Sequence, residues 1–526
     1  MTTGFMVLAA VLAVTVTDEE LRKMVAADVA KPVRPPAANG GKFWNMNAVR
    51  FMYPPAFELP VREGAVKYRY HIFAKGRSYA FDNPSPHMAL DQDWLWKNLP
   101  PGRVTVIREA INRWQFPFRR DERTFWKAEP YEPGAYPPAP RSAREAVRLG
   151  YDFIWRMPSV RYFAEHGRPD PSYHLNCYPA KMQSALIRAY LRCAELNPTN
   201  RAAALKLAAA TADYLIGTSL PEGTPLAGFA PTYAGTHAAA GMYRGMNMLS
   251  YSADVGVAYL KVARATGEKK YLEAAVRIAE RYLALQGEDG TWFLKVREKD
   301  GKPVNPNRLL PDTVIRFLDA LAQTTGETKY RAAADRAFAY FENGPMKDWN
   351  WEGQFEDAHP SAPYENLTKH PACSTAQLIL SRKPRSDENL AAARELLRWS
   401  EDQFVCWRQP GKDDRLALYG RRFVEWIVEP AVIEQYYYRV PVDASAAKLV
   451  NTYLAIYRAE GNPLDLAKAR TLGDSIIRSQ RADGSIPTLW PKGGDSLWIN
   501  CMIASLEALE NLADAENNLS MKGKTK

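Results

Sequence analysis

A repeated pair of amphipathic segments from Ala143 onward constrains the fold of this chain more than any other feature. Each copy has an aromatic-Leu pair, a small residue, a polar turn with Gly or Asn, and a second amphipathic segment. Clear copies start at Tyr190, Tyr259, Phe317 and Tyr453, and degenerate copies lie near Leu378 and Leu506. The copies recur at long, irregular intervals, which suit helical hairpins with insertions better than a thin solenoid. We therefore predict a mainly α fold in which six or seven hairpins close into an (α/α) toroid over residues 143–515.

The connections between these segments are of two kinds. One kind is short and bland, as in ARATGEKKY and AQTTGETKY. The other kind is long and rich in aromatic, charged and glycine residues, and it covers 218–245, 286–312, 342–370 and 480–498. Because successive connections alternate between the two ends of a hairpin array, the long ones should share one face of the ring. Long structured loops on one face of a rigid scaffold usually form the active site.

Residues 45–128 have a different pattern from the rest of the chain. Segments such as VKYRYHIFA and RVTVIREAI alternate apolar and polar residues and are rich in β-branched and aromatic types. This pattern, interrupted by turn-rich stretches, predicts a small antiparallel β-sandwich. A Pro-rich linker at 129–142 follows it, and a polar tail at 516–526 ends the chain.

The N-terminal residues contain an apolar run that precedes the acidic residues 18–20. The run is too short to span a bilayer and fits the core of a signal peptide. We therefore expect residues 1–17 to be a signal peptide and the protein to be secreted or periplasmic. The charged start of an ordinary signal is missing, so a misassigned start codon and a buried terminal strand are the alternatives.

Composition narrows the range of functions. A hydrophobic content of 46% and a charged content of 24% are ordinary for a soluble globular protein. The net charge of +10 favours a polyanionic partner, and we expect an acidic polysaccharide, with no nucleic acid because no Lys/Arg-rich run occurs. We expect no stable membrane insertion. The five cysteines have no zinc-site spacing, and phosphate-loop, nucleophile-elbow and H-E-x-x-H motifs do not occur. We therefore expect no metal and no cofactor.

The first candidate site lies in TYAGTHAAAGMYRGMNMLSY. His237, Arg244 and Tyr251 are spaced seven apart, so they share one stripe if the segment is helical. Tyr243 and Asn247 flank the stripe as candidate substrate-binding residues. A cation, an imidazole and a phenol suit β-elimination from a uronic acid, which needs a partner for the carboxylate, a base and an acid. The alternative is that the imidazole and phenol are core groups and the arginine pairs with an acid on a neighbouring helix.

The second candidate site is the segment WNWEGQFEDAHPSAPYENLTKH. Adjacent Glu356 and Asp357 could be the paired carboxylates of a glycosidase, or could bind a cation or cap a helix. His370 lies just before an inner helix of the expected barrel, where side chains face the mouth, and it is a catalytic candidate. Trp351 and Tyr364 are candidate substrate-binding residues from the same segment.

Other segments supply further substrate-binding candidates. Arg421, next to Arg422, could hold a substrate carboxylate or pair with a nearby glutamate. Asn176, in the sequence YHLN, could polarise a carboxylate or cap a helix. Trp292 and Trp490 lie in two of the long loops, where an indole ring could stack on a sugar or could belong to the core.

Together, the β-module, the hairpin repeats and these loops resemble the toroid-fold polysaccharide lyases, in particular those acting on alginate or glucuronan. Residues 64–102 also resemble the fibronectin-like module that precedes helical catalytic domains in bacterial polysaccharide-degrading enzymes. The lyase resemblance implies an Arg and a Tyr about two helical turns apart, with a His nearby and typically no metal. Arg244 and Tyr251 match that spacing, and His237 or His370 could supply the imidazole.

The function predicted from this resemblance is β-elimination in a uronic-acid-containing polysaccharide such as alginate, glucuronan or a glycosaminoglycan. Six-hairpin glycoside hydrolases, including unsaturated uronyl hydrolases, share the expected architecture and are the first alternative. A uronyl C-5 epimerase is the second, because it removes the same C-5 proton.

Overall fold

The computed structural model describes residues 16–34, 44–57, 60–86, 88–90, 94–235, 237–357, 363–411, 425–436 and 438–524. Most of the predicted signal peptide, residues 1–15, lies outside the described residues. The first described helix is α1 (Asp18–Asp28), where the Thr17 hydroxyl accepts from the Glu20 backbone and the Glu20 side chain accepts from the Thr17 backbone in a capping box.

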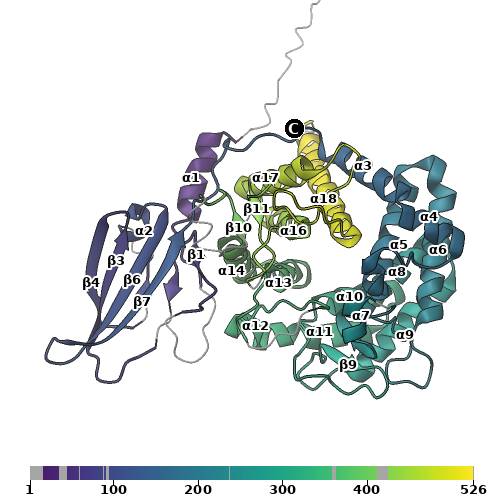
Figure 1. The fold of residues 1–526 in the computed structure, drawn as a ribbon, viewed down its shortest axis with the longest axis horizontal. Coiled ribbons are helices and arrows are strands. Elements are labelled where there is room, and N and C mark those ends of the chain that lie inside the picture. The colour runs from purple at the N-terminus through teal and green to yellow at the C-terminus, as the bar shows by residue number, and fades with distance from the viewer. Residues whose placement is uncertain are drawn as a thin grey trace, which may run out of the picture.

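Two concentric rings of helices form the main body (Figure 1). The inner helices are α5 (Pro179–Leu196), α8 (Leu249–Thr266), α10 (Asp312–Thr325), α13 (Lys369–Arg382), α16 (Asp443–Glu460) and α18 (Ile499–Lys524). Their outer partners, in the same order, are α6 (Arg201–Thr218), α9 (Lys269–Leu285), α11 (Thr328–Asn343), α14 (Asp387–Phe404), α17 (Pro463–Ser479) and α3 (Ala143–Arg156). Each inner helix contacts the next, and α18 contacts α5, so the ring closes. The predicted mainly α toroid is confirmed, with six inner helices among the described residues.

Glycine determines where several inner helices end. Helices α8, α10 and α16 stop at Gly267, Gly326 and Gly461, whose φ angles of 76°, 77° and 78° lie in the left-handed region. Glycine adopts this conformation without steric cost, so it closes the helix and allows a short turn into the outer helix. These turns are the short connections of the sequence. The opposite connections, from outer to inner helices, are the long loops, which therefore lie at one end of the ring.

Shorter elements lie within the connections. They are α4 (Pro158–His166), α7 (Ala238–Met242), α12 (Pro345–Asp348), the 3-10 helices η1 (His174–Cys177) and η2 (Pro198–Asn200), and the strands β8 (Met246–Met248), β9 (Lys295–Arg297), β10 (Val405–Cys406) and β11 (Ala431–Val432). Strand β8 pairs with β9, and β10 pairs with β11. These two small ladders hold the long loops in place beside the ring.

The β-module is a single curved sheet rather than the predicted sandwich. Its strands, β1 (Arg50–Phe51), β3 (Lys67–Ala74), β4 (Arg77–Asn83), β6 (Gly102–Ile111) and β7 (Pro117–Lys127), have the order β1-β7-β6-β3-β4. Only a two-stranded pair, β2 (Ala56–Phe57) and β5 (Met88–Ala89), and the short α2 (Leu95–Asn98) accompany it among the described residues. Trp96 of α2 stacks on Phe125 at 6.2 Å and covers one face.

The other face of that sheet carries ion pairs across its strands. Arg69 pairs with Asp82 at 2.8 Å, and His71 lies 3.4 Å from Glu109. Charged side chains at these outward positions do not bury against a second sheet without a large desolvation cost. The alternation of apolar and polar residues in these strands therefore corresponds to a sheet with one covered face and one face exposed to solvent.

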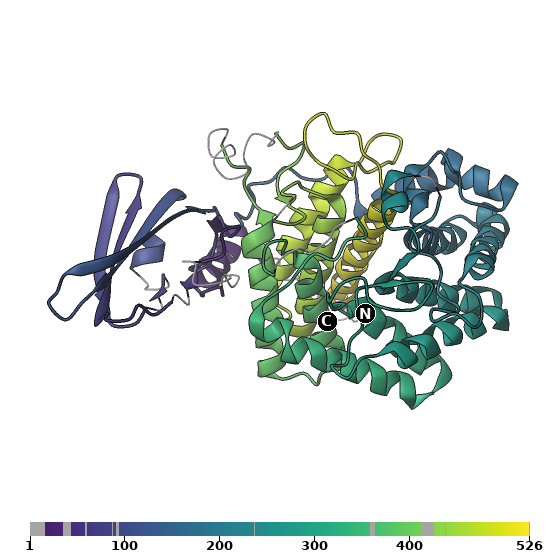
Figure 2. The ribbon, with the colours of Figure 1, turned by 60° about the horizontal axis from the view of Figure 1, so that its bottom comes forward.

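The β-module is fixed to the outer ring at the end of α14, beside α1 (Figure 2). Arg50 donates to the carbonyl oxygens of Asp402 and Val405 at 3.2 and 2.7 Å. The backbone N–H groups of Met52 and Tyr53 donate to Asp402 Oδ1 at 2.5 and 2.9 Å. All of these groups are buried, so the module is attached through a specific hydrogen-bonded interface.

The segment predicted as a linker and the segment predicted as a tail are both parts of the folded structure. Tyr131 is buried, contacts the Trp407 ring at 4.9 Å and shares a 3.2 Å hydrogen bond with Thr471. The Pro-rich segment therefore packs along the helical ring. Helix α18 continues through the predicted polar tail to Lys524.

Candidate active site

A cavity of about 880 Å³ opens at the long-loop end of the ring. It is lined by the N-terminal halves of the inner helices and by the loops that lead into them. Among the described residues, its carboxylates are Asp254, Asp312, Glu352, Glu356, Asp357, Glu434 and Glu507. Its basic groups are Lys181, Lys448, His174, His237 and His370. Aromatic rings also line it, from Tyr178, Tyr251, Phe355, Tyr438 and Trp498. The site is therefore both acidic and aromatic.

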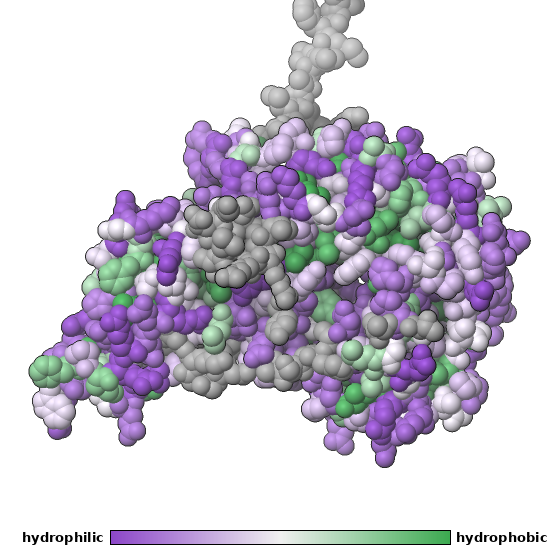
Figure 3. All heavy atoms as spheres, viewed as in Figure 1, coloured by the Kyte–Doolittle hydropathy of each residue, from purple (hydrophilic) through white to green (hydrophobic). Residues whose placement is uncertain are grey.

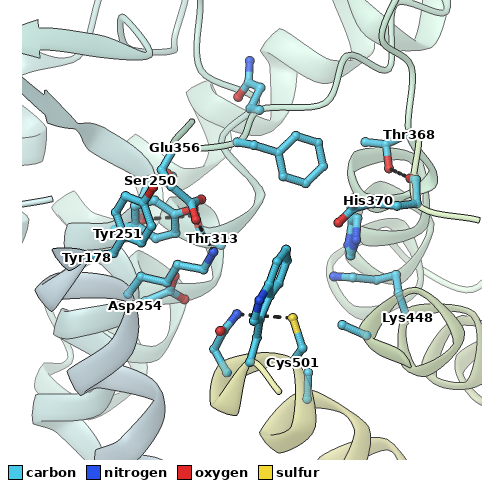
Figure 4. Close-up of a pocket in the computed structure, with 18 of the residues that line it drawn as sticks. Tyr178, Ser250, Tyr251, Asp254, Thr313, Glu356, Thr368, His370, Lys448 and Cys501 are labelled. Atoms are coloured by element: carbon cyan, nitrogen blue, oxygen red, sulfur yellow. Dashed lines mark hydrogen bonds and ion pairs between the residues drawn. The ribbon is translucent and has the colours of Figure 1, made fainter. Parts of the chain in front are cut away.

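Glu356 is at the centre of one wall, where Tyr178, Tyr251 and Asp254 also lie (Figure 4). Its carboxylate forms an ion pair with Lys181 of α5 and accepts a hydrogen bond from the hydroxyl of Tyr251 of α8. Burial alone would raise the pKa of Glu356, but Lys181 and these hydrogen bonds outweigh burial and lower it. The pKa of Lys181 is raised by the same contact. Glu356 is thus held ionised.

The loop that carries Glu356 is anchored from several sides. The Glu356 carbonyl oxygen accepts from the hydroxyl of Tyr233 and from the ammonium of Lys295, both at 2.8 Å. The side chain of Gln354 bonds to the backbone of Leu310 at 2.9 Å. These bonds fix the position of the carboxylate without using its own oxygens.

Glu434 follows β11 and approaches the cavity from another loop. Its carbonyl oxygen accepts from the buried ammonium of Lys369 at 2.7 Å. Burial raises the pKa of the Glu434 carboxyl, and the nearby carboxylates Glu356 and Asp357 raise it further, against the opposing effects of Lys369 and Lys181. The carboxyl of Glu434 therefore retains its proton to a higher pH than the carboxyl of Glu356 does.

Three further carboxyls have raised pKa values because of burial. The pKa of Asp254 rises to about 6, although Arg188 opposes the shift, and that of Glu352 rises to about 7. The pKa of Asp357 is also raised, by burial and by Glu356. Perturbed carboxyls that gather in one cavity are typical of functional sites.

The opposite wall carries His370 and Lys448 (Figure 4). Lys448 donates to the hydroxyl of Ser374 at 3.0 Å. Burial lowers the pKa of His370 well below its usual value, and the positive charges of Lys369 and Lys448 lower it further. The imidazole of His370 is therefore neutral at pH 7, and uptake of a proton is disfavoured in this environment.

The structure brings together part of the predicted site. His237, Tyr251, His370, Glu356 and Asp357 all line the cavity, as the position of the long loops indicated. His237 lies against His174, with ring centroids 5.8 Å apart.

The prediction that His237, Arg244 and Tyr251 share one stripe of a single helix is wrong. The segment breaks after α7, passes through β8 and becomes helical again only at Leu249, because glycines such as Gly245, with φ 74°, interrupt it. Arg244 is exposed and donates to the carbonyl oxygen of Gly235 at 3.2 Å, outside the cavity lining. It is not placed to meet a substrate carboxylate there.

Three polar candidates support loops instead of lining the cavity. Tyr243 donates to the Asp357 carbonyl oxygen at 3.3 Å, so it supports the loop that carries Glu356 and Asp357. Buried Asn247 donates to the Ala230 carbonyl oxygen at 3.1 Å. Asn176 donates to the Asp170 carbonyl oxygen at 2.8 Å.

The tryptophan candidates belong to the core. Trp292, Trp351 and Trp490 are each 0% exposed, which leaves no ring face for a ligand. Tyr364 is half-buried outside the cavity lining, and its backbone N–H donates to Asn350 Oδ1 at 3.0 Å. Arg421 lies outside the described residues.

Sequence reasoning missed Lys181, Glu434, Asp254 and Lys448. Three of them lie within the first two turns of the inner helices α5, α8 and α16, on the face that lines the cavity. A charged residue near the start of each inner segment was the available signal. Glu434 had a weaker signal, because it stands within an aromatic-rich segment without any motif.

Among the described residues, no group of His, Cys, Asp and Glu has the geometry to hold a metal ion. Within the same part of the chain, no helix is both long and apolar enough to cross a membrane.

A scan against models of protein families found no match, and a search of curated proteins found none. Solved structures do match. A cellobiose 2-epimerase from Spirochaeta thermophila DSM 6192 is 14% identical, with 71% of this chain and 99% of that chain covered and a TM-score of 0.49. A family 76 glycoside hydrolase from a bovine Bacteroides thetaiotaomicron strain is 12% identical, with 86% and 95% covered and a TM-score of 0.47. An unsaturated glucuronyl hydrolase specific for heparin is 10% identical, with 71% and 98% covered and a TM-score of 0.44. Similarity at this level assigns no activity.

Proposed function

We propose that this chain is a glycoside hydrolase that uses Glu356 as its ionised carboxylate and Glu434 as its proton donor. One observation carries the proposal. Within one cavity, contact with Lys181 holds Glu356 ionised, while burial and neighbouring carboxylates favour the protonated form of Glu434. Carboxyl groups whose environments push their pKa values apart are typical of an acid and its ionised partner.

The cavity lining suits a sugar. Aromatic rings such as Tyr178 and Trp498 offer apolar faces to the C–H faces of a sugar ring, and the carboxylates and amides between them accept and donate hydrogen bonds to hydroxyl groups. Its volume of about 880 Å³ is enough for more than one sugar unit.

The proposed reaction is hydrolysis with an oxocarbenium-ion-like transition state. Glu434 gives its proton to the glycosidic oxygen as the bond from that oxygen to the anomeric carbon breaks. The negative charge of Glu356 stabilises the positive charge that develops at that carbon. Water adds its hydroxyl to the carbon, and the remaining proton restores the acid form of the site. Lys181 and Tyr251 are positioning residues, because they act on the substrate through Glu356.

The predicted lyase reaction depended on Arg244 to neutralise a uronate carboxylate and on Tyr251 as an acid or base. Arg244 lies outside the cavity lining, and burial and Glu356 together raise the pKa of Tyr251 well above its usual value. Both facts favour hydrolysis over β-elimination. A lyase is the second candidate, since His370 lines the cavity in the neutral form that a base needs, but its lowered pKa makes it a weak base for a carbon-bound proton.

Product analysis separates the two candidates. We expect new reducing ends from glycan oligosaccharides, with release of nitrophenol from a matching nitrophenyl glycoside and no rise in absorbance near 235 nm. Glu356→Gln should lose about 10²–10⁴-fold in turnover, the usual contribution of such a group. Glu288→Gln is the matched control, because Glu288 is exposed and outside the cavity lining. An absorbance rise on a uronate polymer would establish the lyase and refute the hydrolase.

Secretion and a polysaccharide substrate follow naturally from this proposal. A glycan polymer is met outside the cell, which agrees with the signal peptide expected at 1–17. Cell fractionation of the native host tests this, and a protein confined to the cytoplasm would contradict it.

A further inference from the structure

Three aromatic side chains are exposed at the free end of the β-module, where β6 turns into β7. Trp114, Phe116 and Phe118, called here the aromatic tip, are 63%, 67% and 46% exposed. Figure 3 shows apolar side chains at this end of the module, at the lower left. Exposed aromatic clusters of this kind are uncommon on soluble proteins and usually mark a binding surface.

The turn holds its shape without help from these rings. The Asn112 side-chain oxygen accepts from the backbone N–H groups of Trp114 and Phe116 at 3.0 and 3.1 Å. The Asn112 backbone N–H donates to the Phe116 carbonyl oxygen at 3.0 Å. Because the backbone already satisfies the turn, folding does not require large aromatic residues at these positions.

The tip lies far from the interface with the ring. The interface is at the other end of β7, where Trp126 pairs with Arg50. From Phe118 to that end the strand extends roughly 30 Å, at about 3.3 Å per residue. Both ribbon views show the free end of the module directed away from the helices (Figures 1 and 2). The ring therefore leaves the tip open.

The surroundings of the tip are basic. Residues 45–128 contain 14 Lys and Arg against 8 Asp and Glu, so the module carries +6 of the net charge of +10. The guanidinium of Arg113 lies 4.1 Å above the Trp114 ring, and Arg119 is exposed on the strand that follows. Positive charge beside exposed rings is complementary to a sugar chain that bears carboxylate or sulfate groups.

We propose that the aromatic tip is a binding site for an acidic polysaccharide, separate from the cavity. Its rings stack on the C–H faces of the sugar units, while Arg113 and Arg119 pair with the anionic groups. The choice of a polysaccharide over other polyanions rests on the proposed glycosidase function. A membrane surface and a second copy of this chain are the other occupants that an aromatic, basic tip could meet.

Affinity electrophoresis of the full chain carrying Glu356→Gln tests the site while leaving the polymer uncut. Gels contain alginate, pectate, chondroitin sulfate or, as the neutral comparison, laminarin. We expect retardation by at least one acidic polymer and much weaker retardation by laminarin. Adding Trp114→Ala should weaken binding about tenfold, as expected for loss of an aromatic anchor. Phe73→Ala is the control, since Phe73 is also exposed, at 43%, but lies at the end of β3 that is away from the aromatic tip.

Several results would overturn this inference. One is that no acidic polymer retards the chain, and another is that the Trp114→Ala variant is retarded as strongly as its parent. A third is that Trp114→Ala leaves polymer binding intact but abolishes binding to lipid vesicles or formation of a dimer. Turnover of a nitrophenyl glycoside by a chain with intact Glu356 reports the proposed function independently. Trp114→Ala should leave that turnover unchanged, so failure of the tip and failure of the cavity give different results.

Discussion

Replacing Lys181 with methionine should change how the activity depends on pH, because Lys181 keeps Glu356 ionised. The side chains of Lys181 and Glu356 are 19% and 8% exposed, so the pair is mostly shielded from water. A contacting opposite charge lowers a carboxyl pKa by about 1–3 units. Lys181→Met should therefore move the acid limb of the kcat/KM profile upward by about 1–3 pH units.

Lys181→Met should also lower the stability of the fold, and the loss should grow as the pH rises. In the native chain the folded-state pKa of Glu356 is lowered, so its contribution is present above the unfolded pKa and is lost as pH falls through the folded value. Without Lys181, burial alone raises the folded pKa, so the variant is least destabilised at acid pH and loses stability as pH rises. At neutral pH the loss should be about 3–5 kcal/mol, as for a buried ion pair deprived of one partner.

The assay is nitrophenyl glycoside turnover from pH 4 to 9, together with thermal melting over the same range. Lys181→Arg keeps a cation and should retain most of the native profile. Tyr251→Phe removes one hydrogen bond to Glu356 and should shift the acid limb in the same direction by a smaller amount. If the Lys181→Met variant melted earlier but kept the native pH profile, Lys181 would be structural and the assignment of Glu356 would be refuted.

Three other outcomes are expected. Glu434→Gln should retain far more turnover on a dinitrophenyl glycoside than on a natural glycoside, because a good leaving group needs no proton. Glu356→Gln should lose turnover on both substrates. If Glu434→Gln lost turnover equally on both substrates, Glu434 would not be the acid. Trp292→Ala should lower the free energy of unfolding by about 3–5 kcal/mol, because it leaves a cavity in the core. The KM of the folded variant should be unchanged. A rise in KM without a loss of stability would instead indicate that Trp292 contacts the substrate. Burial raises the pKa of Asp402 to about 7, so its ionisation destabilises the fold increasingly as the pH rises from the unfolded pKa toward 7. Asp402→Asn removes this ionisation, and its effect on the melting temperature should be more favourable at pH 8 than at pH 4. The same effect at both pH values would show that Asp402 is not the titrating group.

The helical ring and its loop face could be predicted because they follow from local patterns. The amphipathic period fixes the hairpins, and glycines such as Gly267 and Gly326 mark the short turns. Once the hairpins are known, the alternation of short and long connections places the cavity. His370 was found in this way, since its position depends only on where an inner helix begins.

The chemistry inside the cavity depends on contacts that no local pattern contains. Lys181 and Glu356 are 175 positions apart in the chain, and their contact exists only once the ring is closed. The tryptophans failed as binding candidates for the same reason, because a loop such as 286–312 turns its indole inward onto α9. Arg244 was misplaced because spacing by seven means a shared face only within an uninterrupted helix.

The pairing of α3 with α18 has a consequence for synthesis of the protein. Gly150 lets Leu506 approach so closely that a Cβ there would lie 2.4 Å from a leucine methyl carbon, so the first and last helices of the barrel are tightly joined. About 380 residues separate the start of α3 from the end of α18, a stretch that takes tens of seconds to translate at about 5–20 residues per second. Throughout that interval α3 can contact α4 and α5 but not α18, its main partner, so the part of its apolar face that α18 covers stays open. Release of the chain terminus, rather than formation of any single hairpin, therefore sets the moment at which this barrel can close.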